Sequence, residues 1–258
     1  MHKKLVFFIV AGLISSFLAR GQKPDSYTSS EILKNIEKLN VLGTVLYVAA
    51  HPDDECIGAG GTIRKHCDMG VPVDVHCMTG NETRNAELQE ACSILGVRNL
   101  YLSERDDFAI DSSLRNEVVG AILKTQPKIV ITHSSNDYNL NHQECAKIVF
   151  DAVEWASHVT LFDNAHRVER IYHMEINTLF SHPNVNVDIS DTYKHALAAL
   201  KSHKSQTSKA DNFYEKLYDA RTRLRGVQAK CDRAEAFTIT LPEHAGPFYK
   251  ENSVSSLL

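Results

Sequence analysis

Short apolar segments that alternate with segments of helical length are the feature that most constrains the fold of this chain. The apolar segments, which predict strands, are residues 44–50, 71–78, 99–102 and 128–132. The segments with a helical pattern are residues 58–69, 84–95, 114–124 and 143–155. Short apolar strands separated by helices are typical of a parallel sheet that helices cover on both faces. The pattern therefore predicts an α/β fold with a mostly parallel sheet.

The last third of the chain is less regular. Residues 170–175 have an extended pattern, and residues 192–203 and 211–225 have a helical one. No Pro-, Gly- or Ser-rich linker divides the sequence after Gln22. We therefore expect residues 22–258 to form a single domain.

Residues 1–21 are typical of a secretory signal peptide. Lys3 and Lys4 precede an apolar run at residues 5–18, and small residues follow before Gln22. The run is short for a membrane span, which needs about 20 residues; an uncleaved membrane anchor is the alternative. We expect an exported protein, secreted or periplasmic, for which membrane contact is possible only through this segment.

Composition excludes several classes of protein. The formal net charge is −4 and the basic residues form no cluster, which argues against a nucleic-acid partner. A hydrophobic fraction of 43% is too high for a disordered chain. The six cysteines show no C-x-x-C spacing, so a zinc ribbon is not indicated and most are expected to be small core residues. The oligomeric state is left open.

Polar side chains follow each predicted strand. In folds of this class the ligand-binding or active site lies at the carboxyl ends of the strands. The first strand is followed at once by the sequence HPDDE, residues 51–55. Three acids and a histidine at a buried position are costly unless something pairs with them, and a divalent cation would do so. Zn²⁺ accepts histidine nitrogen and carboxylate oxygen, and catalytic sites keep three protein ligands. His51 and one aspartate could supply two ligands and His142 the third, which leaves the other aspartate as general base.

Two alternatives explain the same residues without a metal. Asp53 and Asp54 could complement a helix N-terminus, although capping needs one acid and no histidine. The glycines at positions 58, 60 and 61 could belong to a dinucleotide-binding loop, but the G-x-G-x-x-G pattern fails at Ile63. We expect these glycines to permit close helix packing instead.

The motifs resemble those of the PIG-L/LmbE family of zinc-dependent de-N-acetylases. VLYVAAHPDDECIGAGGTI is similar to the opening of that family, and THSSNDYNLNH, which ends at His142, is similar to its third block. Further similar blocks are RNAE at residues 84–87 with Leu95-Gly96, the segment 187–206 and RAEAF at residues 233–237. The resemblance implies a Rossmann-like three-layer α/β/α domain. It also implies a hydrolase that removes acetyl from an N-acetylglucosamine-type sugar or glycoconjugate.

The same resemblance implies roles for individual residues. His51, Asp54 and His142 would bind one Zn²⁺ per chain, and Asp53 would be the general base. Arg84, Asp106 and His133 would contact the substrate; ion pairing at the surface is the alternative for Arg84 and Asp106, and a place behind the metal ligands for His133.

The third block departs from the family pattern. Asn139 stands where many members have a histidine that stabilises the tetrahedral intermediate, and it could still donate a hydrogen bond to an oxyanion. Asn141 replaces the usual aspartate, which predicts weaker support of the metal ligands. This departure leaves a weakly active or non-catalytic sugar-binding descendant as one alternative. An amidase with the same fold that acts on a larger conjugate amide is the other.

Overall fold

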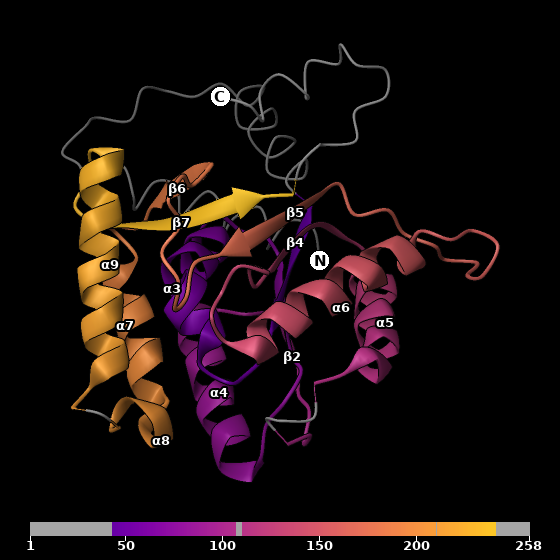
Figure 1. The fold of residues 1–258 in the computed structure, drawn as a ribbon, viewed down its shortest axis with the longest axis horizontal. Coiled ribbons are helices and arrows are strands. Elements are labelled where there is room, and N and C mark those ends of the chain that lie inside the picture. Colours follow the sequence, from indigo (N-terminus) through magenta and orange to yellow (C-terminus); the bar gives the residue numbers. More distant parts are fainter. Residues whose placement is uncertain (1–42, 107–109, 210, 241–258) are drawn as a thin grey trace, which may run out of the picture.

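The computed structural model describes residues 43–106, 110–209 and 211–240 (Figure 1). The predicted signal peptide lies outside these residues. The described chain contains a seven-stranded sheet in the order β3-β2-β1-β4-β5-β7-β6. Its strands are β1 (Thr44–Ala49), β2 (Val73–Cys77), β3 (Asn99–Tyr101), β4 (Pro127–Thr132), β5 (Arg170–Met174), β6 (Val185–Asp188) and β7 (Ala234–Ile239).

Strands β1 to β5 pair in parallel, and β7 pairs antiparallel with both of its neighbours, β5 and β6. The predicted α/β class with a mostly parallel sheet is confirmed. The helices are α3 (Asp54–Asp68), α4 (Glu82–Leu95), α5 (Arg115–Thr125), α6 (Leu140–Ala156), α7 (Tyr193–Ser202), α8 (Lys204–Thr207) and α9 (Phe213–Ala229). A 3₁₀ turn, η1 (Ser112–Leu114), precedes α5.

The helices form one layer on each side of the sheet, with α5 and α6 on one side and the other helices opposite (Figure 1). The side chains of alternate residues of β1 pack against the two helix layers. Val45 and Tyr47 belong to the core under α3, α4 and α7, whereas Leu46 and Val48 belong to the core under α5 and α6. A central strand buried on both faces must be apolar at every position, which explains the continuous apolar run.

Helix α3 begins four residues earlier than the sequence pattern predicts, directly at Asp54. Its glycines permit close packing, as expected: a Cβ on Gly61 would lie 2.7 Å from the side chain of Ile189. The helix is kinked at Ala59. The carboxylate of Glu235 accepts hydrogen bonds from the N–H groups of Gly61 and Thr62 just beyond the kink.

No helix in the described ranges is long and apolar enough to cross a membrane. The six cysteines all lie in these ranges as free thiols, and four of them are buried.

Candidate metal centre and active site

The turn between β1 and α3 places the HPDDE residues at the carboxyl end of the central strand. The backbone N–H of His51 donates to Oδ2 of Asp54 at 2.8 Å. Asp53 has φ 127° and ψ −26°, a conformation that L-residues rarely adopt. This backbone lets α3 begin immediately after Asp53, so both aspartates are held at the end of the sheet.

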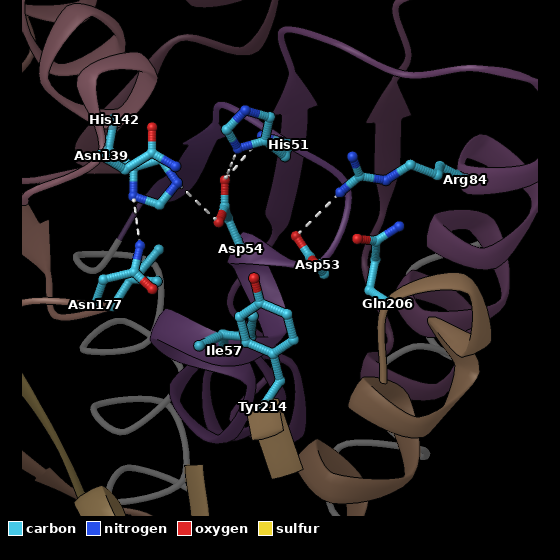
Figure 2. A pocket seen from close by; sticks show the side chains of 11 residues that line it. His51, Asp53, Asp54, Ile57, Arg84, Asn139, His142, Asn177, Gln206 and Tyr214 are labelled. Atoms are coloured by element: carbon cyan, nitrogen blue, oxygen red, sulfur yellow. Dashed lines mark hydrogen bonds and ion pairs between the residues drawn. The ribbon is translucent and has the colours of Figure 1, made fainter. Parts of the chain in front are cut away.

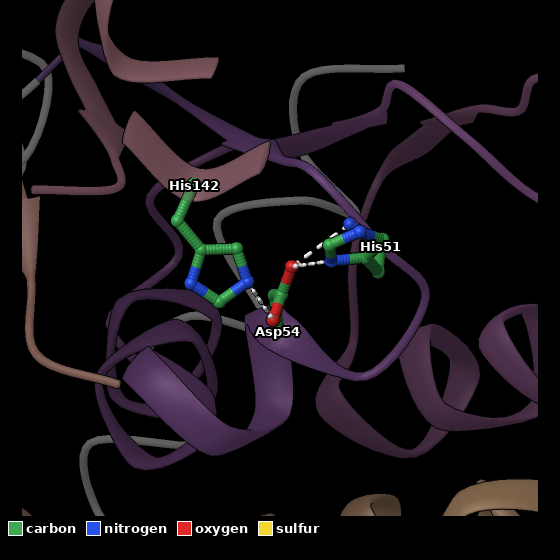
Figure 3. Close-up of side chains that lie close together, drawn as sticks. All are labelled: His51, Asp54 and His142. Atoms are coloured by element: carbon green, nitrogen blue, oxygen red, sulfur yellow. Dashed lines mark hydrogen bonds and ion pairs between the residues drawn. The ribbon is translucent and has the colours of Figure 1, made fainter. Parts of the chain in front are cut away.

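His51, Asp54 and His142 lie together (Figure 3). Nδ1 of His51 lies 3.2 Å from Oδ2 of Asp54, and Nε2 of His142 lies 3.2 Å from Oδ1 of the same carboxylate. One ligand atom from each residue falls within 4.8 Å of the others. His142 reaches this position because α6 begins at Leu140, with the side chain of Asn139 accepting a hydrogen bond from the N–H of Asn141.

Other polar side chains hold the two histidines in place. Oδ1 of Asp137 lies 3.5 Å from Nδ1 of His142, and the Nδ2 atom of Asn141 lies 3.1 Å from Nε2 of His51. His133 is fully buried behind Asp54, with its ring stacked on that of His142 at a centroid distance of 4.0 Å. Partners of this kind fix the orientation of metal-binding histidines.

The two adjacent aspartates have opposite electrostatic environments. Burial, with the neighbouring charge of Asp54 adding to it, raises the pKa of Asp53 to about 7. Burial would also raise the pKa of Asp54, but His142 and His133 outweigh it and hold that pKa well below its ordinary value. Two carboxyl groups whose environments separate their pKa values are typical of a division of roles in a catalytic site.

A cavity of about 160 Å³ opens beside this cluster (Figure 2). Asp53 faces it, and Nη2 of Arg84 donates to the carbonyl oxygen of Pro52 at 2.7 Å and lies 3.4 Å from Oδ1 of Asp53. The lining residues come from six segments of the chain: His51, Asp53, Asp54, Ile57, Arg84, Asn139, His142, Ile176, Asn177, Gln206 and Tyr214.

The structure brings six of the eight predicted site residues to this cavity and leaves two elsewhere. His133 is 0% exposed and its Nε2 accepts a hydrogen bond from the N–H of Ala50, so no substrate can reach it. Asp106 is exposed and is not on the cavity wall. We therefore do not propose either residue as a substrate contact.

Several residues in or beside the cavity carried little or no sequence signal of their own. Asn177 follows β5, and Tyr214 lies in the first turn of α9. Neither position stands out without knowledge of which elements meet. Gln206 lies in the block that resembles the family, which was its only signal. Asp137 belongs to the third block, yet its contact with His142 depends on the fold of the loop before α6.

The sheet and this cluster define an α/β protein with a candidate metal site at the carboxyl ends of parallel strands. Comparison with known proteins agrees. Residues 46–153, which include His51, Asp54 and His142, match the family PIG-L, described as GlcNAc-PI de-N-acetylase. This part of the chain is therefore similar to PIG-L domains, and its resemblance to the PIG-L/LmbE-like de-N-acetylases is confirmed.

Individual relatives support the same grouping. A probable N-acetyl-α-D-glucosaminyl L-malate deacetylase 2 of Bacillus cereus is 29% identical over 188 residues, which are 63% of this chain and 83% of the relative. A diacetylchitobiose deacetylase of Thermococcus kodakarensis is 28% identical over 197 residues, 66% and 72% of the two chains. The solved N,N′-diacetylchitobiose deacetylase of Pyrococcus horikoshii has a TM-score of 0.68 at 26% identity and covers 88% of this chain and 99% of its own.

Proposed function

We propose that this protein is a metal-dependent hydrolase that removes the acetyl group from an N-acetylglucosamine-type sugar or glycoconjugate. The named relatives are deacetylases of such compounds. The observation that carries the proposal is the shared cavity: the carboxylate of Asp53 faces the same space as the His51, Asp54 and His142 cluster. A proton acceptor beside a candidate metal site is the arrangement that amide hydrolysis requires.

The chemistry and spacing of the cluster fit one Zn²⁺ per chain. Two imidazoles and a carboxylate are ligands of catalytic zinc sites. His51 and His142 each approach one oxygen of the Asp54 carboxylate at 3.2 Å, and one ligand atom from each of the three residues lies within 4.8 Å of the others. These residues would hold the ion. When bound, such an ion polarises the amide carbonyl and makes water more acidic.

Asp53 is proposed as the general base and, later in the reaction, the general acid. Its carboxylate takes a proton from the attacking water and returns it to the nitrogen that leaves with the sugar. Arg84 holds the carboxylate from one side, because its guanidinium is itself fixed by the carbonyl oxygen of Pro52. Both residues are buried, which limits the competition of bulk water for these contacts.

Asn139 is proposed to stabilise the developing oxyanion. Its Oδ1 is occupied in the cap of α6, where it accepts from the N–H of Asn141 at 2.9 Å. The Nδ2 group is then the donor that this side chain can offer to the substrate oxygen from the cavity wall.

Acetate release from a panel of N-acetylglucosaminides, free and lipid-linked, tests the proposal. We expect release from at least one compound, its loss after treatment with a chelator, and recovery on addition of Zn²⁺. The free sugar and the lipid-linked compounds distinguish the possible aglycones. A protein that binds the sugars but releases no acetate from any of them at full zinc occupancy would contradict the proposal.

A further inference from the structure

The backbone of Asp53 is held in its unusual conformation from both sides. Its carbonyl oxygen accepts hydrogen bonds from the N–H groups of Cys56 and Ile57 in the first turn of α3. Its own N–H donates to Oε2 of Glu55 at 3.0 Å. A non-glycine residue with positive φ persists only where its surroundings impose it, so the Glu55 carboxylate is part of what fixes Asp53.

Glu55 is in turn held by one residue from a distant part of the chain. Its Oε1 lies 2.9 Å from Nε2 of His203, and both side chains are 0% exposed. Each oxygen of this carboxylate therefore has its own partner, Asp53 on one side and His203 on the other. A buried carboxylate that loses its partner must move or take up a proton, because an uncompensated charge is costly in the protein interior.

His203 also fixes a segment of the cavity wall. It stands between α7 and α8, and its carbonyl oxygen accepts from the N–H of Gln206 at 3.0 Å. Ser205, just before Gln206, donates to the carboxylate of Glu87 through its N–H and its hydroxyl. Gln206 lines the cavity on the same side as Asp53 and Arg84 (Figure 2).

We propose that Glu55 and His203 are positioning residues that hold the carboxylate of Asp53 toward the cavity. The proposal rests on the proposed function, in which Asp53 is the general base. Neither residue lines the cavity, so neither touches the substrate. The contacts run from His203 through Glu55 to the N–H of Asp53. They fix the position of the proposed base at the end of the sheet. A displacement of about 1 Å at a reacting group can cost 10²-fold in rate.

Glu55, Cys56 and His203 could instead be three ligands of a second metal, since their ligand atoms fall within 4.8 Å of one another. The direct contact at 2.9 Å between Glu55 and His203 favours a hydrogen-bonded pair. A measured stoichiometry of two metal ions per chain that drops to one in His203→Met would overturn the positioning role.

Two variants of His203 test the proposal with the full-length protein. Met has a similar volume but no donor for Glu55, whereas the amide of Gln can donate at the same distance along the side chain. We expect His203→Met to lower kcat about 10- to 100-fold, with KM and zinc content close to those of the wild type. We expect His203→Gln to recover most of the lost kcat. If the Met variant does not fold, the Gln variant decides: a kcat close to that of the wild type supports the proposal, and a 10- to 100-fold loss although the donor is retained contradicts it.

Tyr218→Phe is the matched control. It removes a hydrogen bond of 2.7 Å to another fully buried carboxylate, Glu235, which also contacts α3 but not Asp53. We expect a lower melting temperature and an unchanged kcat. If His203→Met behaves in the same way, the Glu55–His203 pair only stabilises the fold and the proposal is wrong.

Crystal structures of the wild type and of His203→Met give a readout that needs no substrate. We expect that in the variant the backbone of Asp53 no longer has a positive φ, or that its N–H no longer donates a hydrogen bond to Glu55. An unchanged Asp53 overturns the positioning role even where acetate release is normal. Absence of acetate release from the wild type, with a displaced Asp53 in the variant, overturns the proposed function alone.

Discussion

Asp137 contacts His142 from the side opposite Asp54: its Oδ1 lies 3.5 Å from Nδ1 of the imidazole, while Asp54 lies 3.2 Å from Nε2. Asp137 is itself fixed, since it accepts hydrogen bonds from the N–H groups of Asn139 and Asn177. The replacement of the usual aspartate by Asn141 therefore leaves His142 with a carboxylate partner. Asn141 contacts His51 instead.

Removal of this carboxylate should weaken metal binding. We expect Asp137→Ala to lower the affinity for Zn²⁺ about 10- to 100-fold, because His142 loses the group that orients its ring. Competition with a chromophoric chelator measures the affinity. Asp151→Ala, which removes an exposed carboxylate of α6 paired with Arg115, is the control and should bind zinc like the wild type. Equal affinities for all three proteins would show that Asp137 has no part in holding His142.

Replacement of the proposed base should separate catalysis from metal binding. We expect Asp53→Asn to reduce acetate release about 10²- to 10⁴-fold, the usual contribution of acid–base catalysis. Its zinc content, measured by mass spectrometry of the metal, should stay near that of the wild type because the three proposed ligands are intact. Glu82→Gln, an exposed change in the first turn of α4, serves as the control. Unchanged turnover in Asp53→Asn would refute the assignment of the base.

Loss of a proposed ligand, in contrast to loss of the proposed base, should abolish metal binding. We expect His142→Ala to lose stoichiometric zinc, and with it the rise in melting temperature that zinc gives to a protein that binds it only when folded. His158→Ala, an exposed histidine just after the same helix, should keep both. Full zinc occupancy in His142→Ala would disprove the proposed ligand set.

The positions of the site residues along the chain were predictable, because they follow from strand ends. A continuous apolar strand ends at Ala49, and the polar residues after it must lie at the edge of the sheet. The same reasoning placed His142 after β4. The start of α6 at Leu140 depended on a local cap by Asn139, which the helical pattern alone does not locate.

The far wall of the cavity and the antiparallel edge of the sheet were not predictable in this way. Strand β6 is four residues long, and β7 pairs with β5 and β6 only through contacts between distant parts of the chain. Tyr214 and Gln206 reach the cavity because α8 and α9 pack beside α3 and α4. The packing of these helices depends on contacts between residues that are far apart in the sequence. A local sequence pattern therefore does not predict it.

The proposed signal peptide gives a prediction about the mature chain. We propose that the protein is exported and that cleavage occurs before Gln22, after a basic start and a short apolar run. N-terminal sequencing of the protein from the extracellular or periplasmic fraction should read from Gln22. Lys3→Glu combined with Lys4→Glu should slow export, whereas Lys23→Glu should not. A chain that stays in the membrane fraction with Met1 intact would favour the anchor.

His76 predicts how the stability of the fold depends on pH. This side chain of β2 is buried, and neither ring nitrogen has a hydrogen-bond partner among the described residues. Burial lowers its pKa from 6.5 to about 4. Between these values the unfolded chain binds a proton that the folded chain does not, so stability is complete above pH 6.5 and falls as the pH drops toward 4.

The free energy of unfolding should therefore fall by about 2 kcal/mol through His76 alone between about pH 7.5 and pH 5. Urea denaturation of the wild type and of His76→Leu measures this contribution as the difference between their pH dependences. The Leu variant, which leaves no unpartnered polar atom at this position, should lose less stability on acidification. His182→Leu, at an exposed position, should follow the wild type. Parallel pH profiles for the wild type and His76→Leu would mean that His76 binds its proton as readily in the folded as in the unfolded chain, which would contradict the prediction.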